Sequence, residues 1–281
     1  MKRKILNRTQ GFRTKDGAGV SLVRVLSRNT TKEYDPILML DSFDSTDPED
    51  YIKGFPMHPH RGIETITYLR EGTMTHKDSM GNEDTITDNE VQWMTAGSGI
   101  MHEEMPKPSK RMLGVQLWLN LLAKDKMVRP HYQSLRCDDL KIVEEDNAKV
   151  KVISGEYKGI KEYAPKYLPL DFYEIEIKKN EEITIDTKQD YQVILFTLIG
   201  DIEVEGDVVS EKTAVTTTDG EKLTIKAKDE DVIVLFLQSI PTNEEISWAG
   251  PIVMNTNEDL RQASLDLRNG TFIKEKPEED Q

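Results

Sequence analysis

Two pairs of residues that can bind metals stand out in the first half of the chain. His58 and His60 lie in the stretch HPH, and His102 and Glu104 lie in the stretch HEE. In an extended strand, side chains two positions apart point to the same face. If both stretches are extended and lie on neighbouring strands, three imidazoles and one carboxylate surround a single point.

This donor set of three nitrogens and one oxygen suits a borderline divalent ion such as iron, manganese, nickel, copper or zinc. Calcium is disfavoured because it prefers more oxygen ligands. Either pair alone is more often a hydrogen-bonded pair than a metal site, and that alternative stays open for each. The two pairs together, with the glycine-rich turn AGSG just before His102, favour the metal site.

Short strands are expected to position these pairs. Eight stretches combine β-branched residues with period-two alternation, namely 20–26, 64–69, 150–155, 172–177, 192–200, 201–206, 222–227 and 231–237. Gly200 and Asp201 form a candidate hairpin turn. Many short strands separated by turn residues predict an all-β fold of the sandwich or barrel type.

Helical signals are few. The stretch 121–127 predicts a short helix, and 256–269 predicts a terminal helix, which Thr256 can cap and Gly270 can end. The polar stretch 134–149 separates two β-rich halves, so we expect one domain at 1–137 and another at 138–281. All five histidines lie in the first half, so only the first domain can use imidazole ligands.

Composition narrows the class of protein. With 37% hydrophobic and 31% charged residues, the chain is typical of globular proteins, and no segment has the ~18 apolar residues of a membrane span. The single cysteine, Cys137, excludes an intrachain disulfide and fits a reducing compartment. We therefore expect a cytoplasmic monomer that does not bind membranes.

Charge is distributed unevenly along the chain. Residues 1–140 hold 20 basic and 20 acidic side chains, whereas 141–281 hold 17 basic and 31 acidic ones, so the net charge of −14 comes from the second half. An acidic surface repels phosphate backbones, and direct nucleic-acid binding is therefore not expected. An acidic face could meet a basic protein partner, although such a face more often serves solubility.

Longer stretches around the two pairs resemble the pirin family of the cupin superfamily. They are HPHRGIETITYLREG, DSMG, VQWMTAGSGIMHEEMP and VQLWLN in the first half, and GPIVMNTNEDLRQASLDLRNG at 250–270. The resemblance covers nearly the whole chain. It implies a bicupin, with two β-barrels of the jelly-roll type packed face to face. The N-terminal barrel would hold a metal, usually iron, and the C-terminal barrel would have lost its ligands.

The resemblance implies that His58, His60, His102 and Glu104 bind this metal, the same four residues that strand alternation selects. We expect one divalent ion, Fe(II) first, with Mn, Ni, Cu, Co and Zn as alternatives. No other cofactor-binding residue is expected.

Four nearby residues receive other interpretations. Glu64 stands where many other cupins have a carboxylate ligand, and we interpret it as a supporting residue, with direct ligation as the alternative. His76 is interpreted as a buried histidine bonded to its surroundings, and His131 as a loop residue. Asn89 replaces a glycine that is usual in the family, and asparagine tolerates a positive φ better than other residues with a side chain.

The resemblance implies a quercetin 2,3-dioxygenase-like oxidoreductase, which would open the ring of a flavonol with O2. Glu104 is expected to act additionally as the catalytic base toward the flavonol hydroxyl. The competing hypothesis is a redox-sensing metal protein that acts on protein partners, as a transcription cofactor does, without turnover. A third is a diverged cupin that keeps the metal and has lost turnover.

Overall fold

The computed structural model describes residues 1–276 and divides the chain into two compact units. The histidine-containing unit consists of residues 13–23, 37–137 and 242 onward. The histidine-free unit consists of residues 1–12, 24–36 and 138–241. Beside the expected ranges 1–137 and 138–281, these compact units place residues 1–12 and 24–36 with the second half of the chain, and residues from 242 onward with the first half.

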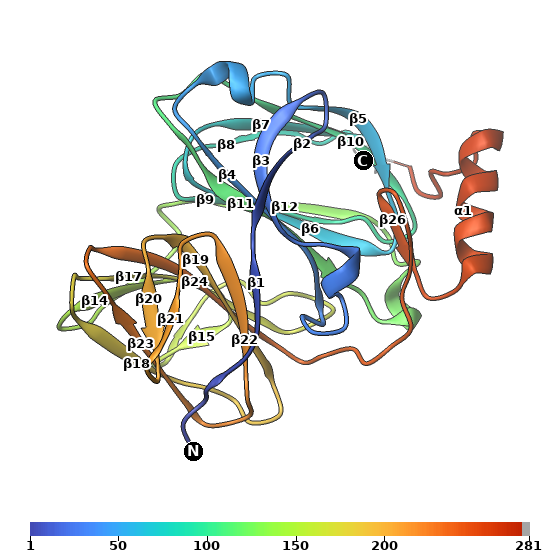
Figure 1. Cartoon of the computed structure of the whole chain (residues 1–281). Helices are drawn as coiled ribbons and strands as arrows, with labels where there is room; N and C mark the ends of the chain where they lie inside the picture. Colours follow the sequence, from blue (N-terminus) through green and yellow to red (C-terminus); the bar gives the residue numbers. More distant parts are fainter. Residues whose placement is uncertain (277–281) are drawn as a thin grey trace. The chain divides into compact units, whose positions relative to one another are not determined.

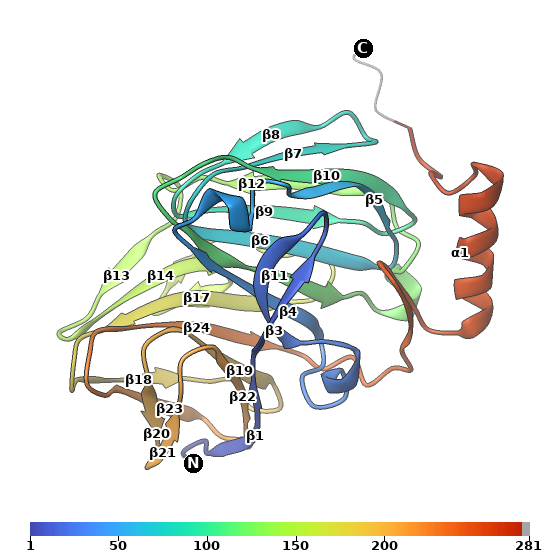
Figure 2. The same ribbon diagram turned by 45° about the horizontal axis from the view of Figure 1, so that its top comes forward.

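The histidine-containing unit has two main sheets, which form separate layers in Figure 2. The larger sheet contains, in spatial order, β12 (His131–Leu135), β9 (Glu90–Thr95), β6 (Ile63–Glu71), β11 (Met112–Asn120), β4 (Ile37–Ser45), β3 (Val20–Leu26) and β2 (Phe12–Asp16). The smaller contains β5 (Phe55–His60), β10 (Ile100–Pro106), β7 (Met74–Asp78) and β8 (Glu83–Ile86).

The histidine-free unit also has a seven-stranded and a four-stranded sheet. The larger contains β1 (Ile5–Gln10), β22 (Thr213–Thr217), β19 (Gln192–Ile199), β24 (Val232–Ser239), β17 (Leu170–Ile177), β14 (Ala148–Ser154) and β13 (Ile142–Glu144). The smaller contains β18 (Glu182–Asp186), β23 (Lys222–Ala227), β20 (Ile202–Val204) and β21 (Asp207–Val209). A hairpin, β15 (Glu156–Tyr157) and β16 (Ile160–Lys161), accompanies them.

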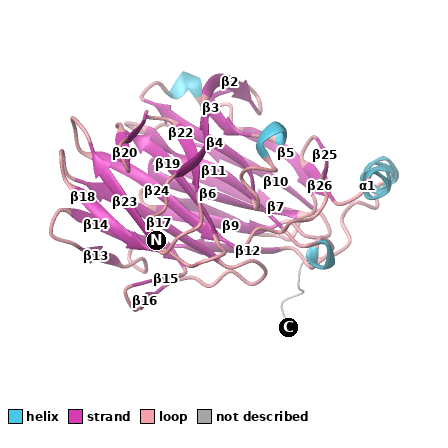
Figure 3. Ribbon diagram, turned by 60° about the horizontal axis from the view of Figure 1, so that its bottom comes forward, coloured by secondary structure: helices cyan, strands magenta, loops and turns pink. Residues whose placement is uncertain are grey.

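Strands dominate the described residues, in which α1 (Asn257–Asn269) is the one α-helix (Figure 3). The expected all-β fold with a short C-terminal helix is confirmed. Thr256 accepts a hydrogen bond from Asp259 N at the start of α1, and Gly270 ends the helix with a φ of 68°. The stretch 121–127 contains only a 3-10 turn at Ala123–Asp125. No helix in residues 1–276 is long and apolar enough to cross a membrane.

Two turns show how local sequence directs the strands. Asn89 precedes β9 and adopts a φ of 63°, as its place in a glycine position suggested. Gly200 and Asp201 do not form the expected hairpin, because β19 and β20 belong to different sheets. This turn instead carries the chain from the larger sheet to the smaller one. Its sequence signals a reversal but does not encode which strands pair.

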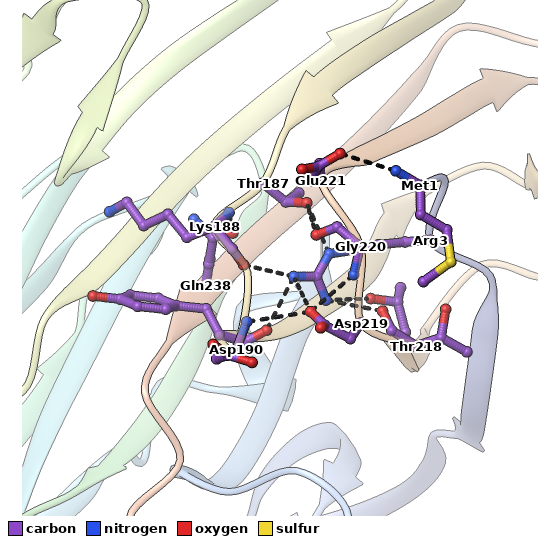
Figure 4. A network of polar contacts seen from close by, with 12 residues as sticks. Met1, Arg3, Thr187, Lys188, Asp190, Thr218, Asp219, Gly220, Glu221 and Gln238 are labelled. Atoms are coloured by element: carbon purple, nitrogen blue, oxygen red, sulfur yellow. Dashed lines mark hydrogen bonds and ion pairs between the residues drawn. The ribbon is translucent and has the colours of Figure 1, made fainter.

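The N-terminal segment completes the histidine-free unit. Strand β1 pairs with β22, with Arg8 opposite Val215, and lies beside it in Figure 1. Arg3 precedes β1 and is only 1% exposed. Its guanidinium donates to Thr187 Oγ1 at 2.8 Å, Thr218 O at 2.9 Å and Lys188 O at 2.7 Å (Figure 4). This buried charge therefore anchors the start of the chain.

Candidate metal centre

Alternation along β10 builds the polar face of the smaller sheet. Burial in this strand alternates strictly, and its buried positions include His102 and Glu104. The neighbouring strand β5 is the edge of the sheet, a place that tolerates Pro59. His102 pairs with His58, and Ile100 pairs with His60. Both i, i+2 pairs therefore lie on neighbouring strands.

Three of these side chains converge on one point. His58 Nε2 lies 3.1 Å from His60 Nε2 and 3.0 Å from His102 Nε2. In residues 1–276, these histidines form the one group of three or more possible ligands whose atoms all lie within 4.8 Å of one another. His60 and His102 are buried and His58 is half-buried, so the cluster approaches the surface at His58.

Backbone carbonyls orient two of the rings. His58 Nδ1 lies 2.9 Å from Pro56 O, and His60 Nδ1 lies 2.9 Å from Pro251 O. A carbonyl oxygen can only accept a hydrogen bond, so each Nδ1 carries the proton and each Nε2 presents its lone pair to the cluster. This is the tautomer in which Nε2 can bind a metal.

The third ring is oriented by another histidine. His76 Nε2 donates to Asp78 Oδ2 over 2.8 Å, which leaves Nδ1 of a neutral His76 as an acceptor. His102 Nδ1 lies 3.4 Å from this atom and can donate to it. The lone pair of His102 Nε2 then also points into the cluster. His76 is thus a buried, hydrogen-bonded histidine outside the converging group, as interpreted from the sequence.

Electrostatics explain why a cation fits here. Burial, together with the neighbouring His58, lowers the pKa of His60 to about 3. Burial likewise lowers the pKa of His102 well below its usual value, and the neighbouring histidines add to this effect. Protonation of His60 or His102 therefore does not readily relieve the repulsion between the nitrogen lone pairs of the cluster, which lie within 4.8 Å of one another. The three converging imidazole nitrogens suit a borderline divalent ion, which the residues present could hold.

The C-terminal segment supports this cluster from far along the chain. Pro251 lies between the short strands β25 (Ser247–Ala249) and β26 (Ile252–Met254). Gly62, with a φ of 81°, allows β26 to approach, because a Cβ there would lie 2.0 Å from Val253 O. Trp118 meets the His60 ring edge to face, with 5.0 Å between centroids.

Helix α1 and the residues after it hold the neighbouring Arg61. This guanidinium is 2% exposed and donates to Asp266 Oδ2, Phe272 O and Ser98 O at 2.7–2.8 Å. Sequence reasoning missed these supports. A backbone carbonyl such as that of Pro251 leaves no residue-type signature, and its segment was assigned to the other domain.

Glu104 does not belong to the converging group. Its Oε1 accepts hydrogen bonds from Thr67 Oγ1 at 2.9 Å and from Gln92 Nε2 at 2.8 Å. Both bonds end on the same oxygen, so they hold the carboxylate without engaging Oε2. Ligation by Glu104 stays a prediction.

Glu64 lies on the face of its sheet that points away from Glu104. Strands β6 and β9 pair without interruption from Glu64–Thr95 to Leu69–Glu90, so side chains alternate regularly between them. Thr67 and Gln92 are paired and both reach Glu104, which places Glu64, three positions before Thr67, on the other face. Direct ligation by Glu64 is therefore disfavoured.

His131 is an exposed residue that begins β12, and the loop interpretation of this residue is wrong. It lies outside the converging group. This exposed position makes it a useful control among the five histidines.

Family comparisons cover both halves of the chain. The family model described as Pirin matches residues 19–119, and the model described as Pirin C-terminal cupin domain matches residues 172–273. The two matches include every converging histidine in the first half and most of the histidine-free sheets in the second.

Individual relatives match over nearly their whole length. A pirin-like protein from Caulobacter vibrioides is 38% identical, over 96% of this chain and 99% of its own. A Pseudomonas aeruginosa protein with the provisional name quercetin 2,3-dioxygenase is 37% identical, over 96% of this chain and 98% of its own. The crystal structure of quercetin 2,3-dioxygenase from Acinetobacter baumannii superimposes with a TM-score of 0.89 at 31% identity, covering 97% of this chain and 99% of that one.

Proposed function

Since the chain belongs to the pirin family and carries its two cupin domains, we propose that it is a mononuclear metal-dependent dioxygenase of flavonols such as quercetin. The observation that carries this proposal is the convergence of His58, His60 and His102, each with its Nε2 lone pair directed inward. The names of the Pseudomonas and Acinetobacter relatives support the choice of reaction.

The three histidines and Glu104 are proposed to hold one divalent ion, with Fe(II) as the physiological metal. Mn, Ni, Cu, Co and Zn are the alternatives that the same nitrogen donors accept. When bound with open coordination positions, iron would supply the one-electron chemistry that allows O2 to react with a flavonol. The protein contributes fixed ring orientations, so little reorganisation is needed when the metal binds.

Glu104 is proposed to have a second role as the general base. The hydrogen bonds from Thr67 and Gln92 fix Oε1, so Oε2 is the atom that would accept the proton of the flavonol hydroxyl. Deprotonation makes the flavonol electron-rich and prepares it for oxidation. The half-buried His58 marks the side from which a flat aromatic substrate would approach.

Oxygen uptake with quercetin tests the proposal directly. Protein purified without oxygen is loaded with Fe(II), its metal content is measured, and O2 consumption is followed in wild type, His60→Ala and His131→Ala. We expect about one metal per chain and turnover in wild type and His131→Ala, and loss of both in His60→Ala. The matched control removes an exposed imidazole from the same unit.

Glu104→Gln separates the two proposed roles of the carboxylate. Loss of a general base lowers the rate by about 10²–10⁴-fold, whereas loss of a ligand lowers metal content. The dioxygenase proposal would be contradicted if the wild-type protein binds metal but consumes no O2 with any flavonol tested, whichever of the candidate metals is loaded. That result would favour a redox-sensing protein that acts on protein partners.

A further inference from the structure

A second buried polar pair lies beside the histidine cluster on β7. His76 and Asp78 are paired across the sheet with Glu104 and His102, respectively. Both side chains have no exposed surface. A buried carboxylate and imidazole are costly to desolvate, and neither belongs to the converging group. Because His76 and Asp78 are buried beside His102 and Glu104, they can contribute to the histidine cluster in ways other than packing.

Asp78 is held as an acceptor by a complete set of donors. Its Oδ1 accepts from Met80 N at 2.8 Å and Asn82 N at 3.1 Å, and its Oδ2 accepts from His76 Nε2 at 2.8 Å. The Asn82 amide also donates to both oxygens. Every one of these groups is a donor, so the arrangement suits an ionised carboxylate.

Stacking fixes the plane of the His76 ring. Tyr132 lies nearly parallel to it, with centroids 4.4 Å apart and 19° between planes. The Tyr132 hydroxyl donates to Asp84 Oδ2 at 3.1 Å, which anchors the stacked ring in turn. The His76 ring is therefore restrained both in its plane and along its hydrogen bond to Asp78.

The three converging histidines differ in what supports them. His58 and His60 donate to neutral carbonyl oxygens of Pro56 and Pro251. His102 alone faces another imidazole, which is itself bonded to a carboxylate. An anion at the end of such a chain makes the imidazole a stronger electron donor, and a neutral carbonyl does so less.

We infer that Asp78 and His76 form a hydrogen-bond relay that holds His102 in its ligating tautomer and increases the electron donation of its Nε2 to a bound metal. This inference rests on the proposed metal site but not on the dioxygenase reaction. His76 and Asp78 are thus positioning residues that act through His102. The relay stabilises higher positive charge on the metal, and so favours Fe(III) relative to Fe(II).

Metal affinity without substrate provides the first test. Apo protein is titrated with Co(II) against a competing chelator, and the visible absorption of bound Co(II) reports the ligand field. His76→Leu removes the acceptor for His102 Nδ1 and should weaken Co(II) binding about 10–100-fold. His76→Asn places an amide oxygen near the former Nδ1 and should restore most of the affinity. If His76 had a purely structural role, restoring the hydrogen-bond acceptor in His76→Asn would not raise the Co(II) affinity above that of His76→Leu.

The reduction potential provides the second test. Asp78→Asn keeps the shape of the side chain but removes the charge, and a tenfold loss of Fe(III) affinity relative to Fe(II) shifts the potential by about +59 mV. Glu83→Gln, which neutralises an exposed carboxylate on β8, should leave the potential unchanged. Circular dichroism establishes that each variant is folded.

Several results would overturn the relay. These are equal Co(II) affinity in wild type and folded His76→Leu, equal loss in His76→Asn and His76→Leu, or an unchanged potential in Asp78→Asn. If wild type binds metal and the variants respond as expected, but no flavonol is oxidised, the relay stands and the proposed reaction fails. If wild type binds no metal, both fail.

Discussion

The two four-stranded sheets have the same topology, but the side chains that they bury differ in polarity. In β5-β10-β7-β8 and in β18-β23-β20-β21, the chain contributes its first, fourth, second and third strands in that order. In the histidine-free unit, the buried side chains of this sheet are all apolar and join one core cluster: Ile183, Ile185, Ile202, Val204, Val209, Leu223, Ile225 and Ala227. In the histidine-containing unit, the same architecture presents imidazoles and carboxylates.

The difference shows that topology does not determine what a cupin barrel contains. An apolar interior gains free energy from burial, at roughly 25 cal/mol per Å². Buried imidazoles and carboxylates require hydrogen bonds or a metal to offset their desolvation. The family fold is therefore maintained in one unit by hydrophobic packing, while the other unit gives up part of that packing for a polar site.

The largest expected effect is the loss of metal binding when a histidine of the histidine-containing unit is removed. His102→Ala removes the most enclosed of the three converging nitrogens, and we expect metal content to fall from about one per chain to below about 0.1. Elemental analysis after anaerobic loading provides the measurement, with His131→Ala as the control. Full metal content in His102→Ala would place the site elsewhere and remove the contrast between the units.

Arg3→Ala should weaken the histidine-free unit without affecting the metal. Three carbonyl oxygens and two hydroxyl oxygens would lose this donor, so we expect a loss of about 3 kcal/mol in the free energy of unfolding. Arg8→Ala, an exposed arginine on β1, is the matched control. Urea denaturation followed by far-UV circular dichroism measures the effect.

Tryptophan fluorescence assigns that loss to a unit. All three tryptophans, Trp93, Trp118 and Trp248, belong to the histidine-containing unit. We expect the circular dichroism signal of Arg3→Ala to fall at lower urea than its fluorescence change, with metal content unchanged. An unaltered circular dichroism midpoint would show that Arg3 does not anchor the histidine-free unit.

The sequence predicts the local features that distinguish the two units better than it predicts their long-range contacts. Alternation correctly placed His58 and His60 on one face, because the period of a strand depends only on neighbouring residues. Pairing of β1 with β22 joins residues some 200 positions apart, and no local pattern specifies such a partner. Spacing placed Glu104 on the face of His102, yet the Thr67 and Gln92 bonds that hold it depend on tertiary structure.

Glu64 provides a prediction about pH. Burial raises the pKa of this carboxyl to about 7, although hydrogen bonds from Thr95 and Trp93 partly oppose the shift. The native state therefore keeps a proton that the unfolded state releases above its ordinary pKa near 4.5, so stability falls as pH rises from 4.5 to 7.

Glu64→Gln should remove this dependence. Near pH 4 the variant and wild type should unfold alike, and at pH 8 the variant should be more stable by about 3 kcal/mol. Urea denaturation of the metal-free proteins across this pH range measures the difference. A constant difference at all pH values would show that Glu64 does not retain its proton on folding.

The smallest expected effect tests the apolar interior itself. Ile225→Val deletes one buried methyl group from β23 and should cost about 1 kcal/mol of unfolding free energy. Thr224→Ser deletes one methyl group from the adjacent residue, whose hydroxyl meets that of Thr184 on the other face of the sheet. This control should change stability by less than about 0.5 kcal/mol.

Equal costs for the two deletions would contradict the contrast between the sheets, because the inward face of β23 would then contribute no more than its outward face. A cost confined to Ile225→Val, with one metal still bound per chain, would show that packing in the histidine-free unit stabilises the protein without setting up the metal site. The two interiors would then be separable by measurement, since a methyl group removed from one changes stability and an imidazole removed from the other changes metal content.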